Sequence, residues 1–238
     1  MEALKSFIKK YLKKKSLKIT QISDITQQEW EYIDRVLPYT MTNEERLVTL
    51  LRACKYVIDN DIDGSFVECG VWKGGSSLLI ANFLSNHNAN ERKLYMYDTF
   101  EGMSEPTEND VQYDGQFAGD MLKRGEVICY SSFDEVAKTM HNSAFTNYEM
   151  IKGKVEDTIP GTLPQKIALL RLDTDWYEST KHELEHLFPL VEKGGIVIID
   201  DYGWWEGAKK AVDEYILKNN IKIFLSRVDY TCRVAIKL

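Results

Sequence analysis

The chain has 238 residues, of which 44% are hydrophobic and 28% charged, with a formal net charge of −7 at pH 7. This balance is typical of a folded globular protein and excludes collagen-like, low-complexity and disordered chains. The negative charge argues against broad nucleic-acid binding. No uninterrupted apolar run exceeds four residues, which is too short for a transmembrane helix, and the Lys-rich start lacks the apolar core of a secretory signal. We therefore expect a cytoplasmic protein with no nucleic-acid partner and no integral membrane segment.

The first forty residues differ in composition from the rest of the chain. Residues 1–18 contain seven lysines and one acid, and their apolar residues recur at helical spacing: Leu4, Phe7, Ile8, Tyr11 and Leu12. One apolar stripe on a basic helix predicts an N-terminal helical extension over residues 1–40. We expect the stripe to dock on the chain's own domain or on a second subunit of a homo-oligomer. Binding to an anionic membrane surface is the alternative.

From residue 41 onwards, short apolar runs alternate with amphipathic segments, which predicts one α/β domain over 41–238. The expected helices cover 47–58, 76–84, 133–140, 184–191 and 208–216, and the expected strands cover 66–69, 94–97, 148–151, 167–172, 196–199, 221–228 and 232–236. Thr42 with Glu45, and Ser132 with Glu135, match the capping box that starts a helix. The polar stretch 101–125 is long for a loop and is expected to be a lid over a site.

Continuous apolar strands between helices are typical of a mostly parallel sheet that is covered on both faces. The last two expected strands are separated only by residues 229–231. A parallel crossover needs a dozen residues or more, so this final pair must be antiparallel. The four cysteines are scattered without metal-ligand spacing, and we expect them to be free thiols.

In such a sheet, ligands bind beyond the carboxyl ends of the strands, and here each candidate strand end carries an acid. The first strand runs into Glu68 and then a turn that opens a helix, Gly70-Val71-Trp72-Lys73-Gly74-Gly75-Ser76. Glycines let the backbone approach a ligand, and a helix N-terminus offers free N–H groups. The turn is not a dinucleotide or phosphate-loop motif, and Glu68 suits an ammonium or a sulfonium better than a pyrophosphate. Asp98 ends the next strand, where a carboxylate can accept both hydroxyls of a ribose.

Asp173, Asp200 and Asp201 follow two later strands. Neighbouring strands lie about 4.8 Å apart, so these carboxylates can gather around one ion, and they repel one another unless a cation or protons intervene. Oxygen ligands favour Mg²⁺, Mn²⁺ or Ca²⁺ over zinc. A polar strand end without a metal is the alternative. Asp175 is either a base beside the metal or an acid at the start of a helix.

Four motifs resemble those of macrocin O-methyltransferases, which are metal-dependent enzymes that methylate sugar hydroxyls of natural products with S-adenosylmethionine. The motifs are Glu68-x-Gly70-x-x-x-Gly74-Gly75-Ser76, Asp98-Thr99-Phe100-x-Gly102, Arg171-Leu172-Asp173-x-Asp175-x-Tyr177-Glu178-Ser179-Thr180 and Gly194-Gly195-x-x-Ile198-x-Asp200-Asp201-Tyr202. The similarity runs from about Thr40 to Tyr215. The third motif, from Asp173 to Thr180, is the most specific.

The resemblance implies a class I methyltransferase fold, which is Rossmann-like, with a mostly parallel seven-stranded sheet, a C-terminal antiparallel hairpin and helices on both faces. It implies that S-adenosylmethionine is held by Glu68, Gly70, Val71, Trp72, Gly74, Ser76, Asp98 and Thr99. It also implies Mg²⁺ ligation by Asp173, Asp200 and Asp201, and Asp175 as the general base. The acceptor would be a glycoside hydroxyl, and vicinal diols suit such a site because two oxygens can chelate one ion.

Three other functions are weighed against this one. A catechol or phenol O-methyltransferase would use similar motifs, but such enzymes commonly pair Asp with Asn where this chain has Asp200-Asp201. A metal-dependent hydrolase could use the same carboxylates but would need neither Glu68 nor Asp98. A non-catalytic methyltransferase-like module would be expected to have lost the metal ligands. Trp204-Trp205 follows the last acid pair, and these indoles are expected to wall the acceptor pocket or to serve in packing.

Overall fold

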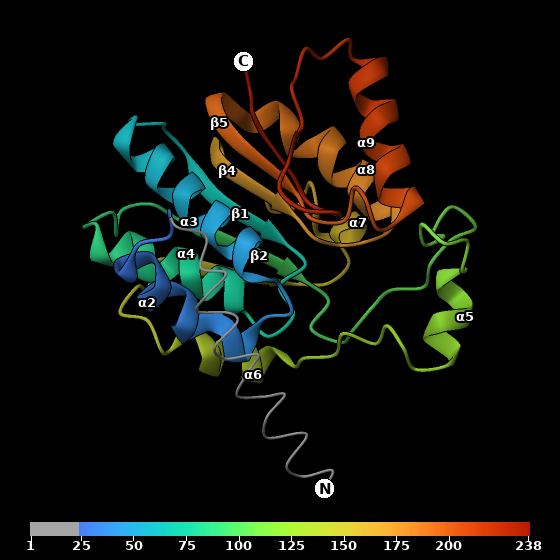
Figure 1. The fold of residues 1–238 in the computed structure, drawn as a ribbon, viewed down its shortest axis with the longest axis horizontal. Helices are drawn as coiled ribbons and strands as arrows, with labels where there is room; N and C mark the ends of the chain where they lie inside the picture. The colour runs from blue at the N-terminus through green and yellow to red at the C-terminus, as the bar shows by residue number, and fades with distance from the viewer. Residues whose placement is uncertain (1–23) are drawn as a thin grey trace, which may run out of the picture.

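The computed structural model describes residues 24–238, so the predicted basic helix over 1–18 lies outside the described residues. A central sheet is covered by helices on both faces (Figure 1). The helices are α2 (Gln27–Val36), α3 (Glu44–Asp59), α4 (Gly75–Asn86), α5 (Ala118–Lys123), α6 (Phe133–Met140), α7 (Val155–Thr158), α8 (Tyr177–His186) and α9 (Glu206–Lys218), with short 3₁₀ turns η1 (Leu37–Tyr39) and η2 (Phe188–Leu190). The strands are β1 (Ser65–Cys69), β2 (Leu94–Asp98), β3 (Tyr148–Lys152), β4 (Ile167–Leu172), β5 (Val191–Ile199), β6 (Ser226–Arg227) and β7 (Arg233–Ile236). No helix within residues 24–238 has the length and apolar character needed to cross a bilayer.

The seven strands lie in the order β3-β2-β1-β4-β5-β7-β6. Strands β1 to β5 pair in parallel, whereas β7 lies antiparallel between β5 and β6. This arrangement confirms the predicted parallel sheet with a C-terminal hairpin. The strand order reverses between β1 and β4, and a crevice for ligands forms at the carboxyl ends of strands where such a reversal occurs.

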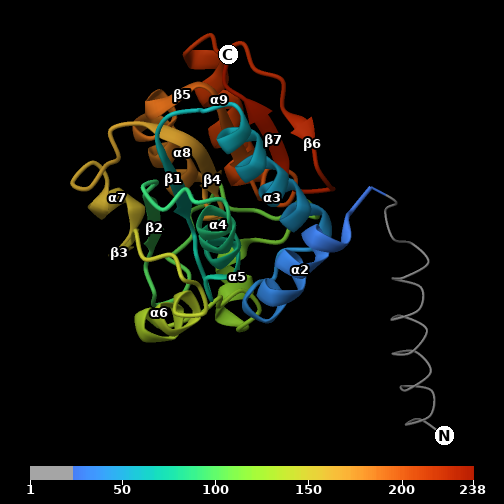
Figure 2. The same cartoon turned by 90° about the vertical axis from the view of Figure 1, so that its left-hand side faces the viewer.

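Each face of the sheet has its own apolar core, because successive strand residues point to opposite faces. Phe66 and Leu169 pack on the face covered by α2, α3 and α4, whereas Val67 and Leu170 pack on the face covered by α7, α8 and α9. The two layers are seen from the side in Figure 2. Helix α2 contributes Ile33 to the first core, so residues 27–36 are packed together with the sheet.

Two helix starts show how local side chains set the boundaries. The capping box predicted for Ser132 and Glu135 is confirmed at the start of α6. The capping box predicted for Thr42 and Glu45 is wrong, because Asn43 caps α3 instead by accepting from the main-chain N–H of Arg46 at 2.9 Å. Either Thr or Asn can fill the cap position, so the sequence alone did not choose between two adjacent candidates.

Two predicted boundaries in the C-terminal third are also wrong. The helix predicted to reach residue 191 ends at His186, because Pro189 cannot continue a helix, and Val191 already belongs to β5. The strand predicted over 221–228 pairs only at residues 226–227. Its alternating Ile221 and Ile223 are partly buried against the second core, so these two side chains pack on the domain although residues 221–225 pair with no strand among residues 24–238. The four cysteines are free, as predicted.

Candidate active site

The carboxyl ends of β1, β2, β4 and β5 surround one cavity of about 270 Å³. The predicted site residues that line it are Glu68, Gly70, Val71, Trp72, Ser76, Asp98, Thr99, Asp173, Asp175, Asp200 and Asp201. Thr42 and Arg46 near the start of α3 also line the cavity, as do residues 153–156 after β3. This grouping of acids could be predicted from the sequence, because the carboxyl ends of parallel strands lie at the same edge of a sheet.

The glycine-rich turn after β1 uses its glycines for two different purposes. Gly70 has φ of 81°, and a Cβ there would collide with the carbonyl oxygen of Asp173, so β1 and β4 could not approach one another with any other residue. Gly74 has φ of 85°, and a Cβ there would lie 3.2 Å from Val136 on α6. Gly74 therefore serves the packing of α4 and does not line the cavity. Helix α4 begins at this turn without a side-chain cap, which leaves N–H groups of its first turn for a ligand.

Asp98 ties the ends of β1 and β2 together. Its Oδ2 accepts from the main-chain N–H groups of Val71 at 2.6 Å and Trp72 at 3.0 Å. Its Oδ1 accepts from the N–H of Phe100 at 2.7 Å. The Thr99 hydroxyl lies 3.4 Å from Oδ1 but donates at 2.6 Å to the carbonyl oxygen of Gly102. A carboxylate has about four acceptor positions, so Asp98 can accept one further hydroxyl from a molecule in the cavity.

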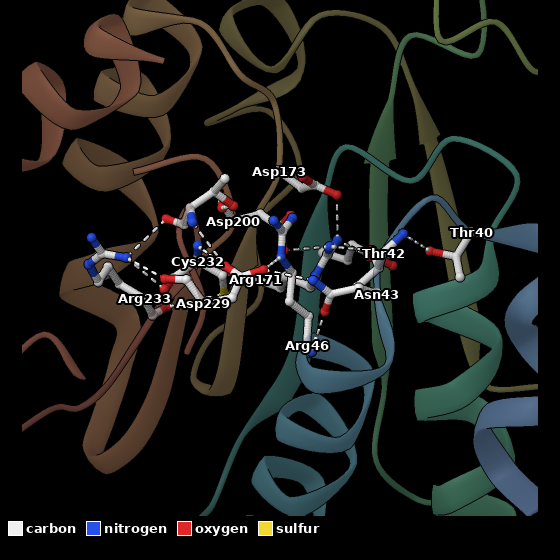
Figure 3. A network of polar contacts seen from close by, with 12 residues as sticks. Thr40, Thr42, Asn43, Arg46, Arg171, Asp173, Asp200, Asp229, Cys232 and Arg233 are labelled. Atoms are coloured by element: carbon white, nitrogen blue, oxygen red, sulfur yellow. Dashed lines mark hydrogen bonds and ion pairs between the residues drawn. The ribbon is translucent and has the colours of Figure 1, made fainter. Parts of the chain in front are cut away.

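The centre of the polar network is Arg171, which stands in β4 and is 2% exposed. Its guanidinium pairs with Glu68 and Asp173 at 2.7 Å each, and with Asp200 at 2.9 Å. Figure 3 shows Arg171 between the two aspartates. Glu68 is fully buried and also accepts from the Ser77 hydroxyl. Burial raises the pKa of Glu68, while Arg171 and Ser77 counteract part of that rise. Burial opposes the charge on Arg171, but its carboxylate partners outweigh burial and raise the pKa of Arg171.

Arg46 extends this network from α3 to the C-terminal hairpin (Figure 3). It pairs with Asp200 at 2.5 Å through Nη1 and with Asp229 at 2.7 Å through Nε. Asp229 also accepts from the main-chain N–H groups of Thr231 and Cys232. Burial by itself would raise the pKa of Asp229, but these hydrogen bonds and Arg46 lower it to about 2. These contacts therefore hold the turn between β6 and β7 against Arg46, which lines the cavity.

Asp173, Asp175 and Asp201 form a carboxylate cluster that opens into the cavity. One oxygen from each residue lies within 4.8 Å of the other two. Oδ2 of Asp201 is buried and has no hydrogen-bond partner among residues 24–238, so it is available to accept from a bound water or to ligate an ion. Asp175 has φ of 67°, a left-handed conformation that is uncommon outside glycine and occurs preferentially at functional sites.

The electrostatics of this cluster disfavour three charged carboxylates. Burial raises the pKa of Asp175 to about 7, with a hydrogen bond to Asp201 acting in the opposite direction. Burial is also the main cause that raises the pKa of Asp173 and of Asp201, and the negative charges of neighbouring aspartates add to it. Only protons or a cation can relieve the repulsion between carboxylates this close.

This geometry differs from the predicted grouping of Asp173, Asp200 and Asp201. Both oxygens of Asp200 are paired with arginines, and Asp175 takes its place among the clustered oxygens. Successive side chains at the end of a strand point to opposite sides, so Asp200 faces the α3 side of the sheet while Asp201 faces the cluster. Whether Asp200 is a metal ligand stays a prediction.

Three further residues of the network had not been assigned a role from sequence. Arg171 could have been noticed, because it is the charged residue within an otherwise apolar run, Ile167–Leu172. Arg46 and Asp229 carried no such signal. They lie 183 positions apart, and the tertiary structure alone brings them together.

Part of the segment over 101–125 contacts this site. Residues 102–104 line the cavity, and Gln112 forms a β-bridge with Trp205. Asp110 is fully buried and caps α8 by accepting from the N–H of Tyr177 at 2.7 Å. Trp205 is buried and meets Trp176 edge to face, with ring centroids 4.9 Å apart, whereas Trp204 is half-buried. Both indoles line the cavity.

The family described as macrocin O-methyltransferase (TylF) matches residues 2–236. The chain therefore belongs to this family of O-methyltransferases, which confirms both the resemblance and the class of enzyme predicted from the motifs. Its sheet is that of a class I, S-adenosylmethionine-dependent methyltransferase.

Individual relatives are similar over most of their length. The chain is 35% identical over 197 residues to demethyldecarbamoylnovobiocin O-methyltransferase of Streptomyces niveus, which covers 80% of this chain and 72% of that protein. It is 31% identical over 195 residues to 8-demethyl-8-(2,3-dimethoxy-alpha-L-rhamnosyl)-tetracenomycin-C 4′-O-methyltransferase of Streptomyces olivaceus, covering 81% of this chain and 73% of the relative. The solved structure of the O-methyltransferase NovP is 32% identical with a TM-score of 0.75, and the match covers 84% of this chain and 82% of NovP.

Proposed function

We propose that the protein transfers the methyl group of S-adenosylmethionine to a sugar hydroxyl of a glycosylated small molecule, with a divalent cation, preferably Mg²⁺, in the site. The observation that carries the proposal is the single cavity, in which the glycine-rich turn and Asp98 face the cluster of Asp173, Asp175 and Asp201. A relative whose name specifies a rhamnosyl-bearing substrate supports the choice of a sugar.

The cofactor is proposed to lie along the turn after β1. The N-terminus of α4, which has no side-chain cap, offers N–H groups to the carboxylate of the cofactor, and Asp98 accepts one ribose hydroxyl. Val71, Trp72, Ser76 and Thr99 line the same part of the cavity. Glu68 has both oxygens engaged by Arg171 and Ser77, so we propose that it holds the turn in position beside the methionine part.

The donor set of the cluster fits a divalent cation. Within residues 24–238, Asp201 has a buried oxygen without a hydrogen-bond partner, and the neighbouring carboxylate oxygens are close enough to share an ion. Asp173 and Asp201 are the ligands that this geometry supports best, and Asp200 is the third predicted ligand. When bound, such an ion lowers the pKa of a coordinated hydroxyl and orients a vicinal diol.

Asp175 is proposed to take the proton of the acceptor hydroxyl. The acceptor oxygen then forms a bond to the methyl carbon while the bond from that carbon to sulfur breaks, which leaves neutral S-adenosylhomocysteine. Positive charge disappears in this step, so the buried walls of the site favour it. Residues 101–125 are proposed to act as a lid that excludes water during the reaction.

Calorimetry with S-adenosylhomocysteine and MgCl₂, followed by methyl transfer to a panel of glycosides and catechols, tests the proposal. We expect binding of both ligands and transfer to a glycoside that EDTA abolishes. Asp201→Asn should weaken Mg²⁺ binding, whereas Asp175→Asn should keep Mg²⁺ and cofactor binding and lower the rate by roughly 10²–10⁴-fold. Full activity after EDTA would show that the reaction does not need the metal. Methyl transfer to catechol but to none of the glycosides would show that the acceptor is not a sugar. Loss of Mg²⁺ binding in Asp175→Asn would make Asp175 a metal ligand.

A further inference from the structure

Three aromatic side chains from distant parts of the chain meet beside the cavity. Tyr113 comes from the 101–125 segment, Trp204 from the turn after β5, and Tyr230 from the hairpin turn between β6 and β7. The ring centroids of Tyr113 and Trp204 lie 4.9 Å apart, and those of Trp204 and Tyr230 lie 5.8 Å apart. Tyr113 is 59% exposed and Tyr230 is 57% exposed, so this aromatic row presents ring surface to solvent.

The row is held in place by the candidate site itself. The main-chain N–H of Trp204 donates to the carbonyl oxygen of Asp201 at 3.0 Å, and the N–H of Tyr113 donates to the carbonyl oxygen of Trp204 at 3.0 Å. The guanidinium of Arg46 lies 5.9 Å from the ring centre of Tyr230, within the range of a cation–π contact. The hydrogen bonds therefore hold the main chain of Trp204 and Tyr113 in place, and Arg46 of the polar network contacts the ring of Tyr230.

The row also continues the wall of the cavity. Trp204 lines the cavity together with Asp175 and Asp201. Trp204 follows Asp201 by three residues, so their Cα atoms are at most about 11 Å apart, a separation that a sugar of one or two rings can span. A group attached to a sugar whose hydroxyl lies at Asp175 can extend along this wall to Trp204. Large exposed aromatic surfaces that border a cavity mark binding sites.

We propose that Tyr113, Trp204 and Tyr230 form the subsite for the aglycone of the acceptor, and that this aglycone is a flat, apolar or aromatic ring system. The inference rests on the proposed function for the sugar that precedes the aglycone. Offset and edge-to-face contacts with such rings add affinity beyond the area they bury. Trp205 also lines the cavity, but it is buried against Trp176 and does not belong to the exposed row.

Three probes test this subsite: p-nitrophenyl α-L-rhamnopyranoside, methyl α-L-rhamnopyranoside and free p-nitrophenol. Dissociation constants are measured on protein saturated with S-adenosylhomocysteine and MgCl₂, for the wild type, Trp204→Leu and Tyr230→Ala. Phe224→Ala is the matched control, because Phe224 is an aromatic residue that is 82% exposed and does not belong to the row. The wild type should bind the nitrophenyl rhamnoside about tenfold more tightly than the methyl rhamnoside, equivalent to about 1.4 kcal/mol. This preference should disappear in Trp204→Leu, shrink in Tyr230→Ala and persist in Phe224→Ala.

The outcomes separate this subsite from the proposed function. If both rhamnosides bind equally to the wild type, or if Trp204→Leu keeps the preference, the aglycone subsite is wrong while the sugar acceptor stands. If the rhamnosides bind no more tightly than p-nitrophenol but the binding of p-nitrophenol is lost in Trp204→Leu, the subsite stands and the sugar acceptor is wrong. If neither nitrophenyl compound binds the wild type, the subsite is rejected.

Discussion

Replacing Arg171 by Met should destabilise the folded protein more than any other single change in the polar network. The guanidinium is 2% exposed and pairs with Glu68, Asp173 and Asp200. Asp200 keeps Arg46 as a partner in the variant, and Asp173 is partly exposed to the cavity. Glu68 is fully buried and keeps only the Ser77 hydroxyl as a hydrogen-bond donor. Most of the lost stability should therefore come from the uncompensated charge of Glu68.

The magnitude follows from the burial of that carboxylate. Removing one partner of a buried ion pair costs about 3–5 kcal/mol of unfolding free energy. Glu68 can reduce this cost by taking up a proton, because burial already raises its pKa in the wild type. A group whose pKa is raised in the folded state loses stabilisation as the pH rises above its unfolded value of about 4.3. The destabilisation by Arg171→Met should therefore be larger at about pH 8 than at about pH 5.

Urea unfolding followed by circular dichroism measures this effect, since an unchanged slope with a lower midpoint reports lost stability. The double variant Arg171→Met/Glu68→Gln removes the stranded charge and should recover more than half of the loss. Arg124→Met breaks an exposed pair with Glu126 and, as a control, should cost less than about 1 kcal/mol. A cost for Arg171→Met below about 1 kcal/mol, or the same cost at both pH values, would refute the reasoning.

Three further predictions concern Asp98 at the proposed cofactor site, Asp229 in the hairpin turn and Asp110 in the proposed lid. S-adenosylhomocysteine at about 100 times its Kd should stabilise the protein by about 2.7 kcal/mol, and Asp98→Asn should remove most of that shift in differential scanning fluorimetry, in which NAD should have no effect. The pKa of Asp229 is lowered to about 2, so this carboxylate should add roughly 2 kcal/mol to the free energy of unfolding above about pH 4, and this stabilisation should be lost as the pH falls towards 2. In acid unfolding of Asp229→Asn, the free energy of unfolding should not show this fall with pH. The same fall in the variant as in the wild type would contradict the ion pair with Arg46. Asp110→Ala should remove the cap on α8 at Tyr177, cost about 1–2 kcal/mol and speed proteolysis within 101–125; equal cleavage rates would contradict the anchoring role.

The location of the site could be predicted because it follows from strand direction. Glu68, Asp98 and Asp173 each stand at or just after the end of an apolar run, and parallel strands bring such ends to one edge. The residue that caps α3 was harder to predict. Thr42 and Asn43 are both suitable caps, and Asn43 was selected by its contact with Asp229 at 2.8 Å, which no local pattern contains.

The sequence by itself determined the class of fold, the family and the edge of the sheet at which the chemistry lies, because hydrophobic period, connection length and motif spacing are local properties. Only the tertiary structure decided which carboxylates of the site pair with arginines and which face the cluster. It pairs Asp200 with Arg46 and Arg171, and among the residues from 24 onwards it gives one oxygen of Asp201 no hydrogen-bond partner, although the two aspartates are adjacent in the chain. The physical reason is that burial and partner choice depend on which groups the packed helices and the hairpin bring within hydrogen-bonding distance, and in this site those groups come from segments more than 150 residues apart.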